Sequence, residues 1–416
     1  MIKKIAFLVV LLFTLNSFAQ KNNISPYSFF GIGETSTLKS INEENMGGIG
    51  GAQNNLYQLH FTNPASYASL RLTTYAIAGR NKYLTVEDNN EKQSTSAFSL
   101  SYLALGIPIG EKAGAVFGIQ PNSKVGYSIL NDVSDTQTNL FFGEGGTNRV
   151  FLGYGHKLPY NFSLGVEGAY VFGNTERKVL NRREGVYLAS MHQTVSDITG
   201  FNLKAGIQNS SKITKNLTLK TGVTVHFEND LKTKGNEKLF SLLNVADPNL
   251  IVDKDEILNR DFNSEINTPL KTIINAGVGT NRWFAGAEYS FQDPILFKDD
   301  VLQNANIQFT TASKIAIGGF YTPKAESLTN YWQRITYRAG FYSKQLGLKI
   351  NNTEINDFGM SFGLTLPSKR KLSNINFGFD IGQKGETKNN LVKENYINFR
   401  LSLSFTDKWF KKRKLN

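Results

Sequence analysis

The stretch 217–228, LTLKTGVTVHFE, alternates apolar and polar residues at a period of two over its whole length. Because successive side chains of a β-strand point to opposite faces, this pattern predicts a strand with one apolar and one polar face. The apolar face would consist of Leu217, Leu219, Thr221, Val223, Val225 and Phe227. The polar face would consist of Thr218, Lys220, Gly222, Thr224, His226 and Glu228.

The same alternation recurs along most of the chain. It is clear in residues 162–173, 355–366, 375–382 and 397–405. A soluble β-sandwich would also alternate, and it is the main alternative at this point. Between residues 70 and 406 the pattern divides into roughly fourteen stretches, which favours an all-β fold, a transmembrane β-barrel of fourteen antiparallel strands.

The amino terminus has the features of a secretory signal. Lys3 and Lys4 precede an apolar run at residues 5–15, and Ser17 and Ala19 are small residues two positions apart. These features predict a signal peptide at residues 1–19, cleaved after Ala19. A helix needs about 20 apolar residues to cross a bilayer, and this run is shorter. No later segment is long and apolar enough to form a helical span, so strands must cross the membrane.

Connectors of two lengths alternate between the predicted strands. Short ones are expected at 110–113, 159–161, 211–215, 280–282 and 367–373, with a longer exception at 321–333, and long ones at 87–94, 131–135, 174–187, 229–265, 292–304, 345–354 and 383–394. Bacterial barrels have short periplasmic turns and longer outer loops. The sequence therefore predicts a barrel at residues 71–406 in the outer membrane of a Gram-negative bacterium. Both termini would be periplasmic, including a basic tail at residues 407–416.

Residues 20–70 fit neither a series of strands nor a long helix. The segment is rich in glycine and aromatic residues, and a barrel of this size is wide enough to enclose it, so we predict an internal hatch. A mobile periplasmic arm is the alternative. The expected hatch residues are Tyr27, Phe29, Phe30, Asn63, Pro64 and Ala65. The glycines at 47, 48, 50 and 51 do not have the spacing of a nucleotide-binding loop, and we interpret them as a source of backbone flexibility.

The composition excludes several kinds of site. The chain has no cysteine, so it has neither a disulfide nor a thiolate metal site. Its four histidines are scattered, and no nucleophile has the partners that it would need. We therefore expect no metal, no cofactor and no enzymatic activity. The net charge is +12, and part of it is concentrated in the tail. The tail could be a solvated terminus or a contact for an anionic partner. We exclude nucleic acid as a partner because of the expected compartment.

Several short motifs resemble the FadL-like family of outer-membrane barrels, the long-chain fatty-acid transporters. They are SPYSFFG at 25–31, NPA at 63–65, GGTNR at 145–149, YRAGFY at 337–342 and FGMSFG at 358–363, and they are most similar to the subgroup found in Bacteroidota. The resemblance covers nearly the whole chain. It implies uptake of hydrophobic compounds through a hatch and a sideways opening in the barrel wall. One relative in the subgroup is the Plug subunit of the type 9 secretion translocon, which seals a larger barrel. The resemblance to this relative implies a sealing role instead of uptake.

A proline inside a predicted strand is a candidate for that sideways opening. Pro121 lies within the third stretch, 115–130, where it removes a backbone donor, and a kink is expected from Gln120 through Asn122 to Ser123. We predict a lateral gate at this kink. The alternative is a bulge that only adjusts the curvature of the wall.

The longest expected outer loop, 229–265, contains an apolar cluster. Its members are Leu239, Phe240, Leu242, Leu243 and Val245. Exposed apolar patches often mark binding sites, so the cluster could be a helical lid that captures a ligand or a docking surface for a partner. Packing against neighbouring loops is the alternative. The acidic residues nearby lack the spacing of a calcium loop.

Charged residues of both signs lie on the predicted polar faces. They include Glu167, Lys204, Lys220, Glu228, Glu288, Arg334, Arg338, Asp380 and Arg400. We expect these side chains to form a network that holds the hatch, in preference to a filter for ions.

Two functions of different class are compatible with the sequence. The first is a monomeric channel, surrounded by outer-membrane lipid, that takes up hydrophobic, fatty-acid-like small molecules. The second is an accessory protein that seals a large secretion barrel. We favour the first, because Pro121 indicates an opening in the wall.

Overall fold

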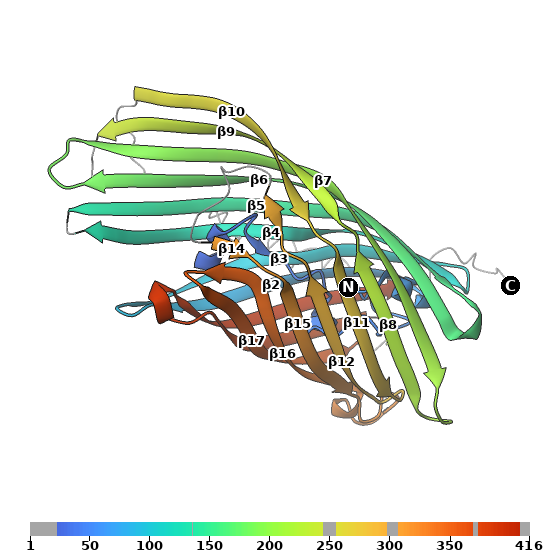
Figure 1. Cartoon of the computed structure of the whole chain (residues 1–416). Helices are drawn as coiled ribbons and strands as arrows, with labels where there is room; N and C mark the ends of the chain where they lie inside the picture. The colour runs from blue at the N-terminus through green and yellow to red at the C-terminus, as the bar shows by residue number, and fades with distance from the viewer. Residues whose placement is uncertain (1–22, 135, 244–254, 298–306, 369–372, 408–416) are drawn as a thin grey trace, which may run out of the picture.

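The computed structural model describes residues 23–134, 136–243, 255–297, 307–368 and 373–407 (Figure 1). The predicted signal peptide, Val245 and the basic tail beyond residue 407 lie outside this part of the chain. None of the helices in the described residues is long and apolar enough to cross a membrane.

The described chain forms a closed antiparallel barrel of 14 strands, which confirms the predicted fold class. The first six strands are β2 (Thr73–Glu87), β3 (Lys92–Ile109), β4 (Ala113–Ser134), β5 (Gln137–Lys157), β6 (Phe162–Arg183) and β7 (Leu188–Lys212). Four strands are interrupted: β8 (Thr218–His226) with β9 (Asn229–Leu243), β10 (Asp255–Thr268) with β11 (Lys271–Gly279), β12 (Trp283–Gln292) with β13 (Leu296–Phe297), and β14 (Ile307–Phe309) with β15 (Ala312–Tyr321). The last four are β16 (Thr336–Ile350), β17 (Thr353–Pro367), β18 (Ser373–Lys384) and β19 (Lys393–Asp407).

The barrel closes where the last strand pairs with the first. The β19–β2 ladder runs from Asp407 opposite Thr73 to Lys393 opposite Glu87. We call the end that contains Thr73 and Asp407 the terminal end and the opposite end the projecting end. Short helical turns lie outside the wall strands, namely η3 (Pro159–Asn161), η5 (Trp332–Arg334) and η6 (Lys388–Asn390).

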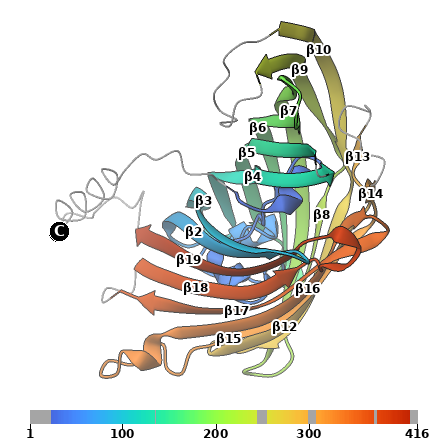
Figure 2. The ribbon, with the colours of Figure 1, turned by 90° about the vertical axis from the view of Figure 1, so that its left-hand side faces the viewer.

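One side of the barrel is much taller than the other. Strands β4 to β7, β9 and β10 continue beyond the barrel at the projecting end, as Figures 1 and 2 show. We call this part the projecting wall. The predicted long loops at 131–135, 174–187 and 229–265 are mostly strands of this wall, so that prediction was wrong. Outside the membrane both faces of a strand can be polar, which removes the alternation by which a strand is recognised.

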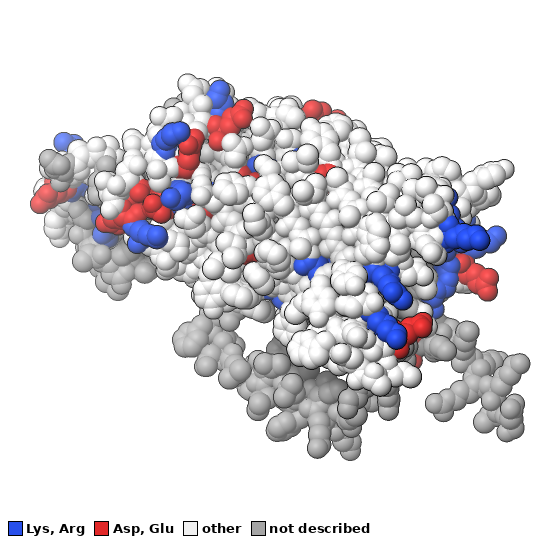
Figure 3. Space-filling view, turned by 90° about the horizontal axis from the view of Figure 1, so that it is seen from below, with Lys and Arg blue, Asp and Glu red and all other residues white. Residues whose placement is uncertain are grey.

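Side chains alternate between the lumen and the outer surface along the membrane-facing part of each strand. In β6, Leu164 and Val166 are exposed outside while Ser163 and Glu167 are buried inside. The exposed apolar side chains form a broad uncharged surface, and Figure 3 shows it as a white region between charged residues at the two ends. A surface of this kind suits a barrel that spans a hydrocarbon layer.

The N-terminal segment, residues 23–72, lies inside the barrel. It contains η1 (Pro26–Phe29), β1 (Glu34–Thr35), α2 (Ile41–Glu44) and η2 (Pro64–Ser69). Its buried side chains form a core with lumen-facing residues of the wall, including Ile41, Phe61 and Tyr67 from the segment with Tyr102 and Phe151 from the strands. The lumen is therefore a packed protein interior over this length.

Candidate functional site: the filled lumen and a split in the wall

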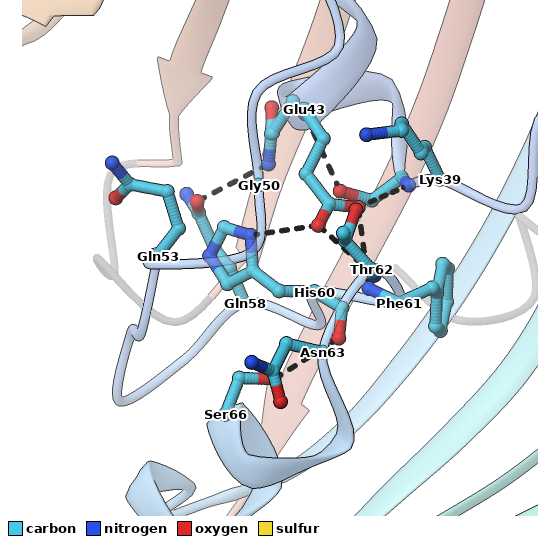
Figure 4. Close-up of polar contacts among 12 residues, drawn as sticks. Lys39, Glu43, Gly50, Gln53, Gln58, His60, Phe61, Thr62, Asn63 and Ser66 are labelled. Carbon is cyan, nitrogen blue, oxygen red and sulfur yellow. Dashed lines mark hydrogen bonds and ion pairs between the residues drawn. The ribbon is translucent and has the colours of Figure 1, made fainter. Parts of the chain in front are cut away.

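A single carboxylate joins the two halves of the N-terminal segment. Glu43 is fully buried and accepts hydrogen bonds from the backbone N–H groups of Ser40 at 2.6 Å, Phe61 at 3.2 Å and Thr62 at 3.2 Å (Figure 4). Ser40 in turn caps α2 and accepts from the Glu43 N–H, which completes a capping box. Glu43 thus serves both as a helix cap and as the link to the stretch 60–63.

His60 lies beside this carboxylate without forming a hydrogen bond to it. Its Nδ1 is 3.8 Å from Glu43 Oε1, and Figure 4 shows the two side chains facing each other. Burial lowers the pKa of His60 to about 4, which outweighs the opposite effect of Glu43. The imidazole is therefore neutral at neutral pH and contributes no ion pair there.

Three lumen carboxylates from the wall attach the segment to the barrel. The first is Glu167 of β6, which forms ion pairs with Arg149 and, at 2.9 Å, with Lys204. It also accepts a hydrogen bond of 2.7 Å from the hydroxyl of Tyr67 in the segment. Lys204 also donates to the carbonyl of Phe61 at 2.7 Å. One buried carboxylate with two buried cations therefore fixes η2 against β5, β6 and β7.

The second carboxylate, Glu288 of β12, binds the glycine-rich turn. It forms an ion pair with Lys39 and accepts from the N–H groups of Gly50 at 3.0 Å and Gly51 at 3.2 Å. A Cβ at Gly51 would lie 1.7 Å from Asn275 Nδ2. These glycines are buried against the wall, where close packing leaves no room for a side chain. Gly47 and Gly48 also have positive φ angles, of 70° and 87°, which the conformational freedom of glycine permits.

The third carboxylate, Asp380 of β18, forms an ion pair with Arg400 of β19. Arg400 Nε also lies 3.0 Å from Glu44 Oε2, and Glu44 contacts Arg80 of β2 at 2.5 Å. The segment is thus tied to the strands on both sides of the closing seam. Arg80, Glu44, Arg400 and Asp380 thus form a row of alternating charges across the seam.

The remaining predicted lumen charges have different outcomes. Lys220 donates to Asn54 Oδ1 of the segment at 2.8 Å, and Arg338 is buried and donates to Thr365. Glu228 is exposed between β8 and β9 and accepts from Asn267, so its placement in the lumen was wrong. Arg334 lies in η5, outside the wall strands, and stacks on Tyr331. A period-two pattern fails at both sites because β8 ends at His226, before Glu228, and β16 begins at Thr336, after Arg334.

The predicted hatch residues all lie in the N-terminal segment and contact the wall. Tyr27 donates to the carbonyl of Val392 at 2.6 Å, and Phe29 packs edge-on against Phe30, Tyr127 and Phe141. Asn63 Nδ2 lies within 3.0 to 3.3 Å of three carbonyls, those of Gly51, Ile207 and Val223. Pro64 and Ala65 begin η2 and are buried.

The wall splits at the predicted kink. The β3–β4 ladder runs from Ile109 opposite Ala113 to Leu103 opposite Ile119 and ends there. Beyond this point β4 pairs only with β5 among the barrel strands of the described chain, with a register shift between Pro121 and Ser123. We call the opening the β3/β4 split. A side-chain hydrogen bond crosses it, from Lys124 Nζ to Ser99 Oγ at 2.7 Å.

The N-terminal segment covers the free edge of β4 from inside. Glu34 and Thr35 of β1 pair with Lys124 and Ser123, and the Ser36 N–H donates to the carbonyl of Asn122 at 2.9 Å. Further along, Gly126 N–H donates to Ser28 Oγ at 3.0 Å. Asn122, the residue at the register shift, therefore binds the segment through its carbonyl group. The buried side chain of Gln120 lies at the base of the split.

This contact gives a prediction about Gly126. A Cβ at this position would lie 2.1 Å from the Asn23 carbonyl oxygen, so Gly126→Ala must push residues 23–28 away from β4. We expect faster amide hydrogen exchange at Ser28 and in β1, with the barrel strands unchanged. Gly168→Ala is the matched control, because nothing lies within 4 Å of a Cβ there. Equal exchange in the two variants would contradict the close packing.

The predicted apolar cluster is not a loop. Leu239, Phe240, Leu242 and Leu243 belong to β9 of the projecting wall, and no helical lid exists in the described part of this hairpin. Phe240 and Leu242 are buried in a cluster that also contains Leu180, Ala189 and Met191. The interpretation as a lid was wrong, because the polar and charged residues that precede the cluster, 232–238, hid a strand that runs beyond the membrane.

Comparison with known proteins identifies the family and structures of similar fold. A model of the family described as BamG matches the chain over residues 1–416. Comparison with curated proteins finds no match. Solved structures of similar fold include a FadL homologue of Pseudomonas aeruginosa, with a TM-score of 0.60 and 13% identity over 89% of this chain and 99% of that one. The toluene transporter TodX of Pseudomonas putida has a TM-score of 0.60 and 14% identity over 90% and 100% of the two chains.

A third structure agrees with these. The monoaromatic hydrocarbon channel CymD has a TM-score of 0.56 and 14% identity, over 92% of this chain and 100% of that one. At such identities the likeness shows a FadL-like barrel fold and leaves activity to be argued from the site itself.

Proposed function

We propose that this chain, which belongs to the BamG family, is an outer-membrane barrel that passes apolar small molecules sideways through the β3/β4 split. The N-terminal segment would serve as the hatch, following a cleaved signal peptide, and both termini would lie in the periplasm. The transported compounds would be uncharged or fatty-acid-like, as the hydrocarbons named for TodX and CymD are apolar.

The observation that carries this proposal is the end of the β3–β4 ladder inside the wall. A barrel in lipid normally pairs every strand, because an open edge leaves backbone groups without partners. Here the free edge of β4 is supplied with partners by residues 25–36 of the segment. The same residues therefore complete the wall and obstruct the opening, which is the arrangement expected of a hatch.

A disulfide across this contact tests the proposal. Thr35 and Ser123 are directly opposite each other in the β1–β4 pair. Opposed residues of antiparallel strands have Cα atoms about 4.5–5.5 Å apart, within the range of a disulfide. The chain has no cysteine of its own, so Thr35→Cys with Ser123→Cys forms a unique pair. We expect oxidation to reduce uptake of an apolar fluorescent probe into proteoliposomes at least tenfold, and reduction to restore it.

The control for this experiment locks a part of the wall that has no role in the opening. Ala78 and Ser402 are opposed on β2 and β19, in the closed seam, and Ala78→Cys with Ser402→Cys should leave uptake unchanged. If the oxidised Thr35–Ser123 variant transports the probe as fast as the reduced one, the hatch function is excluded.

The projecting wall favours a second candidate, an accessory barrel that docks a partner protein. Within the described chain, β10 pairs with β9 along its length but with β13 only at Ile266 and Asn267, so its other edge is open. Open strand edges outside a membrane are sites at which another chain can add a strand. Copurification of a stoichiometric protein from native membranes, together with no uptake by the isolated barrel, would favour this candidate.

A further inference from the structure

The longest turn at the terminal end of the barrel connects β15 to β16. It spans residues 322–335 and contains η5, whereas the turns at 110–112, 158–161 and 280–282 are much shorter. We call residues 322–335 the η5 turn. Figure 2 shows it in orange, beyond the ends of β15 and β16. Its length indicates a role other than joining two strands.

The η5 turn is held by its own hydrogen bonds. The Lys324 N–H donates to the carbonyl of Gln333 at 2.8 Å, which joins the two sides of the turn. The hydroxyls of Thr322 and Thr336 are 2.8 Å apart where the turn meets the strands, and Ile335 is buried. The turn is therefore a built structure, and its outward side chains have defined positions.

The apolar side chains of this turn are exposed. Leu328 is 91% exposed and Trp332 is 69% exposed, and Tyr331 is exposed as well. Apolar side chains that an ordered turn holds in the open mark a surface that contacts another apolar phase.

The η5 turn lies beside a row of aromatic residues on the outer face of the barrel. Trp283, Tyr321 and Tyr337 are directly opposite one another on β12, β15 and β16, and all three are exposed. The hydroxyl of Tyr337 donates to the carbonyl of Trp332 at 3.3 Å, which joins the turn to this row. Tyrosine and tryptophan are enriched where a barrel wall meets the lipid headgroups. The apolar side chains of the turn thus continue the membrane-facing surface.

Basic side chains accompany the aromatic ones. The Arg334 guanidinium lies over the ring of Tyr331, with its central carbon 4.9 Å from the ring centre. In the part of the chain that the structure describes, Arg282, Lys324 and Arg334 form no ion pair, and Glu326 is the one acidic residue of the turn. Long basic side chains beside an apolar surface can reach the phosphates of lipid headgroups.

We propose that the η5 turn is a lipid anchor that lies in the headgroup layer of the membrane at the terminal end. Leu328 and Trp332 contact the upper parts of the acyl chains, and Lys324 and Arg334 lie beside lipid phosphates. Lipid is the occupant because the turn continues the outer wall, where a protein partner would itself have to lie in the membrane. The inference rests on the membrane location proposed above but does not require transport through the β3/β4 split.

The depth of Trp332 in a bilayer tests this anchor. With Trp283→Phe and Trp409→Phe, Trp332 is the only tryptophan of the full-length chain. The variant is reconstituted into vesicles of phosphatidylcholine that carries bromine near the headgroup, at mid-chain or near the chain end. We expect quenching of the Trp332 emission to be at least twofold stronger with bromine near the headgroup than near the chain end. Emission that no brominated lipid quenches would overturn the proposal.

Two reference positions calibrate this measurement. Trp283 alone, in the variant with Trp332→Phe and Trp409→Phe, reports whether the wall itself is in the bilayer. Tyr187→Trp in a chain without the three native tryptophans reports an aqueous position, because residue 187 is 79% exposed in the turn between β6 and β7 at the projecting end. If Trp283 is quenched and Trp332 is not, the anchor fails while the membrane barrel stands. If neither is quenched, the membrane location fails as well.

Charge reversal tests the contact with phosphates. Lys324→Glu with Arg334→Glu should reduce quenching of Trp332 by bromine near the headgroup at least twofold, because carboxylates repel the phosphates. Lys112→Glu with Lys215→Glu makes the same change in charge at exposed positions of two other turns at this end, and it should leave the Trp332 profile unchanged. Unchanged quenching in the first variant, or equal loss in both, would overturn the role of these two cations.

Discussion

Glu167→Ala should destabilise the barrel by about 3–5 kcal/mol, because it leaves Arg149 and Lys204 buried without a counter-charge. The Tyr67 hydroxyl would lose its acceptor at the same time. The measurement is the free energy of unfolding in urea, with the protein refolded into lipid vesicles. The cost should be visible as a lower unfolding midpoint, with η2 more open to protease before the strands unfold.

The matched control is Glu237→Ala in the projecting wall. Glu237 also contacts two basic groups, His192 at 2.7 Å and Arg260 at 2.5 Å, but the Arg260 side chain is 56% exposed. Pairs that are open to water contribute only about 0–1 kcal/mol, so this variant should change stability little. If the two substitutions had equal costs, burial of the Glu167 cluster would not be what stabilises the lumen.

Glu43→Gln should loosen the N-terminal segment while the strands remain folded. The amide that replaces the carboxylate cannot accept on both sides, so at least one of the N–H groups of Ser40, Phe61 and Thr62 loses its acceptor. Each buried N–H group that is left without an acceptor costs about 1–3 kcal/mol. Hydrogen exchange at Phe61 and Thr62 should accelerate by about 5- to 150-fold for such a cost, where local opening limits exchange.

The control for this variant is Glu91→Gln, which makes the same chemical change in the exposed turn between β2 and β3. Its exchange pattern should match that of the unmodified protein. Unaltered protection of Phe61 in Glu43→Gln would show that the two halves of the segment are held by apolar packing alone.

The membrane-facing strands could be predicted from the sequence because lipid and lumen impose opposite requirements on alternate residues. The stretch 217–228 corresponds to β8, Thr218–His226, and the kink expected at Pro121 coincides with a shift of register and with the end of the β3–β4 ladder. Both features are local, since a period of two and a missing N–H depend only on neighbouring residues.

The projecting wall and the lumen contacts could not be predicted in the same way. In β9 the exposed Lys232 and Lys234 alternate with Thr233 and Gly235, neither of which is strongly apolar, so this part of the strand resembles a loop. The hydrogen bonds and ion pairs between the segment and the wall join residues that are far apart in sequence. No local sequence pattern encodes such contacts. One signal was present for the central link, because Ser40 and Glu43 have the spacing of a capping box.

The contacts between the N-terminal segment and the last two strands also constrain how the protein folds. Ser25 donates to Glu394 at 2.5 Å, and Asn45 donates to the carbonyl of Phe377 at 2.9 Å, across separations of 369 and 332 residues. Such contacts give the chain a high contact order, and they form late because a large loop must first be closed. We therefore expect the N-terminal segment, although it is synthesised first, to reach its final position only after β18 and β19 are in place.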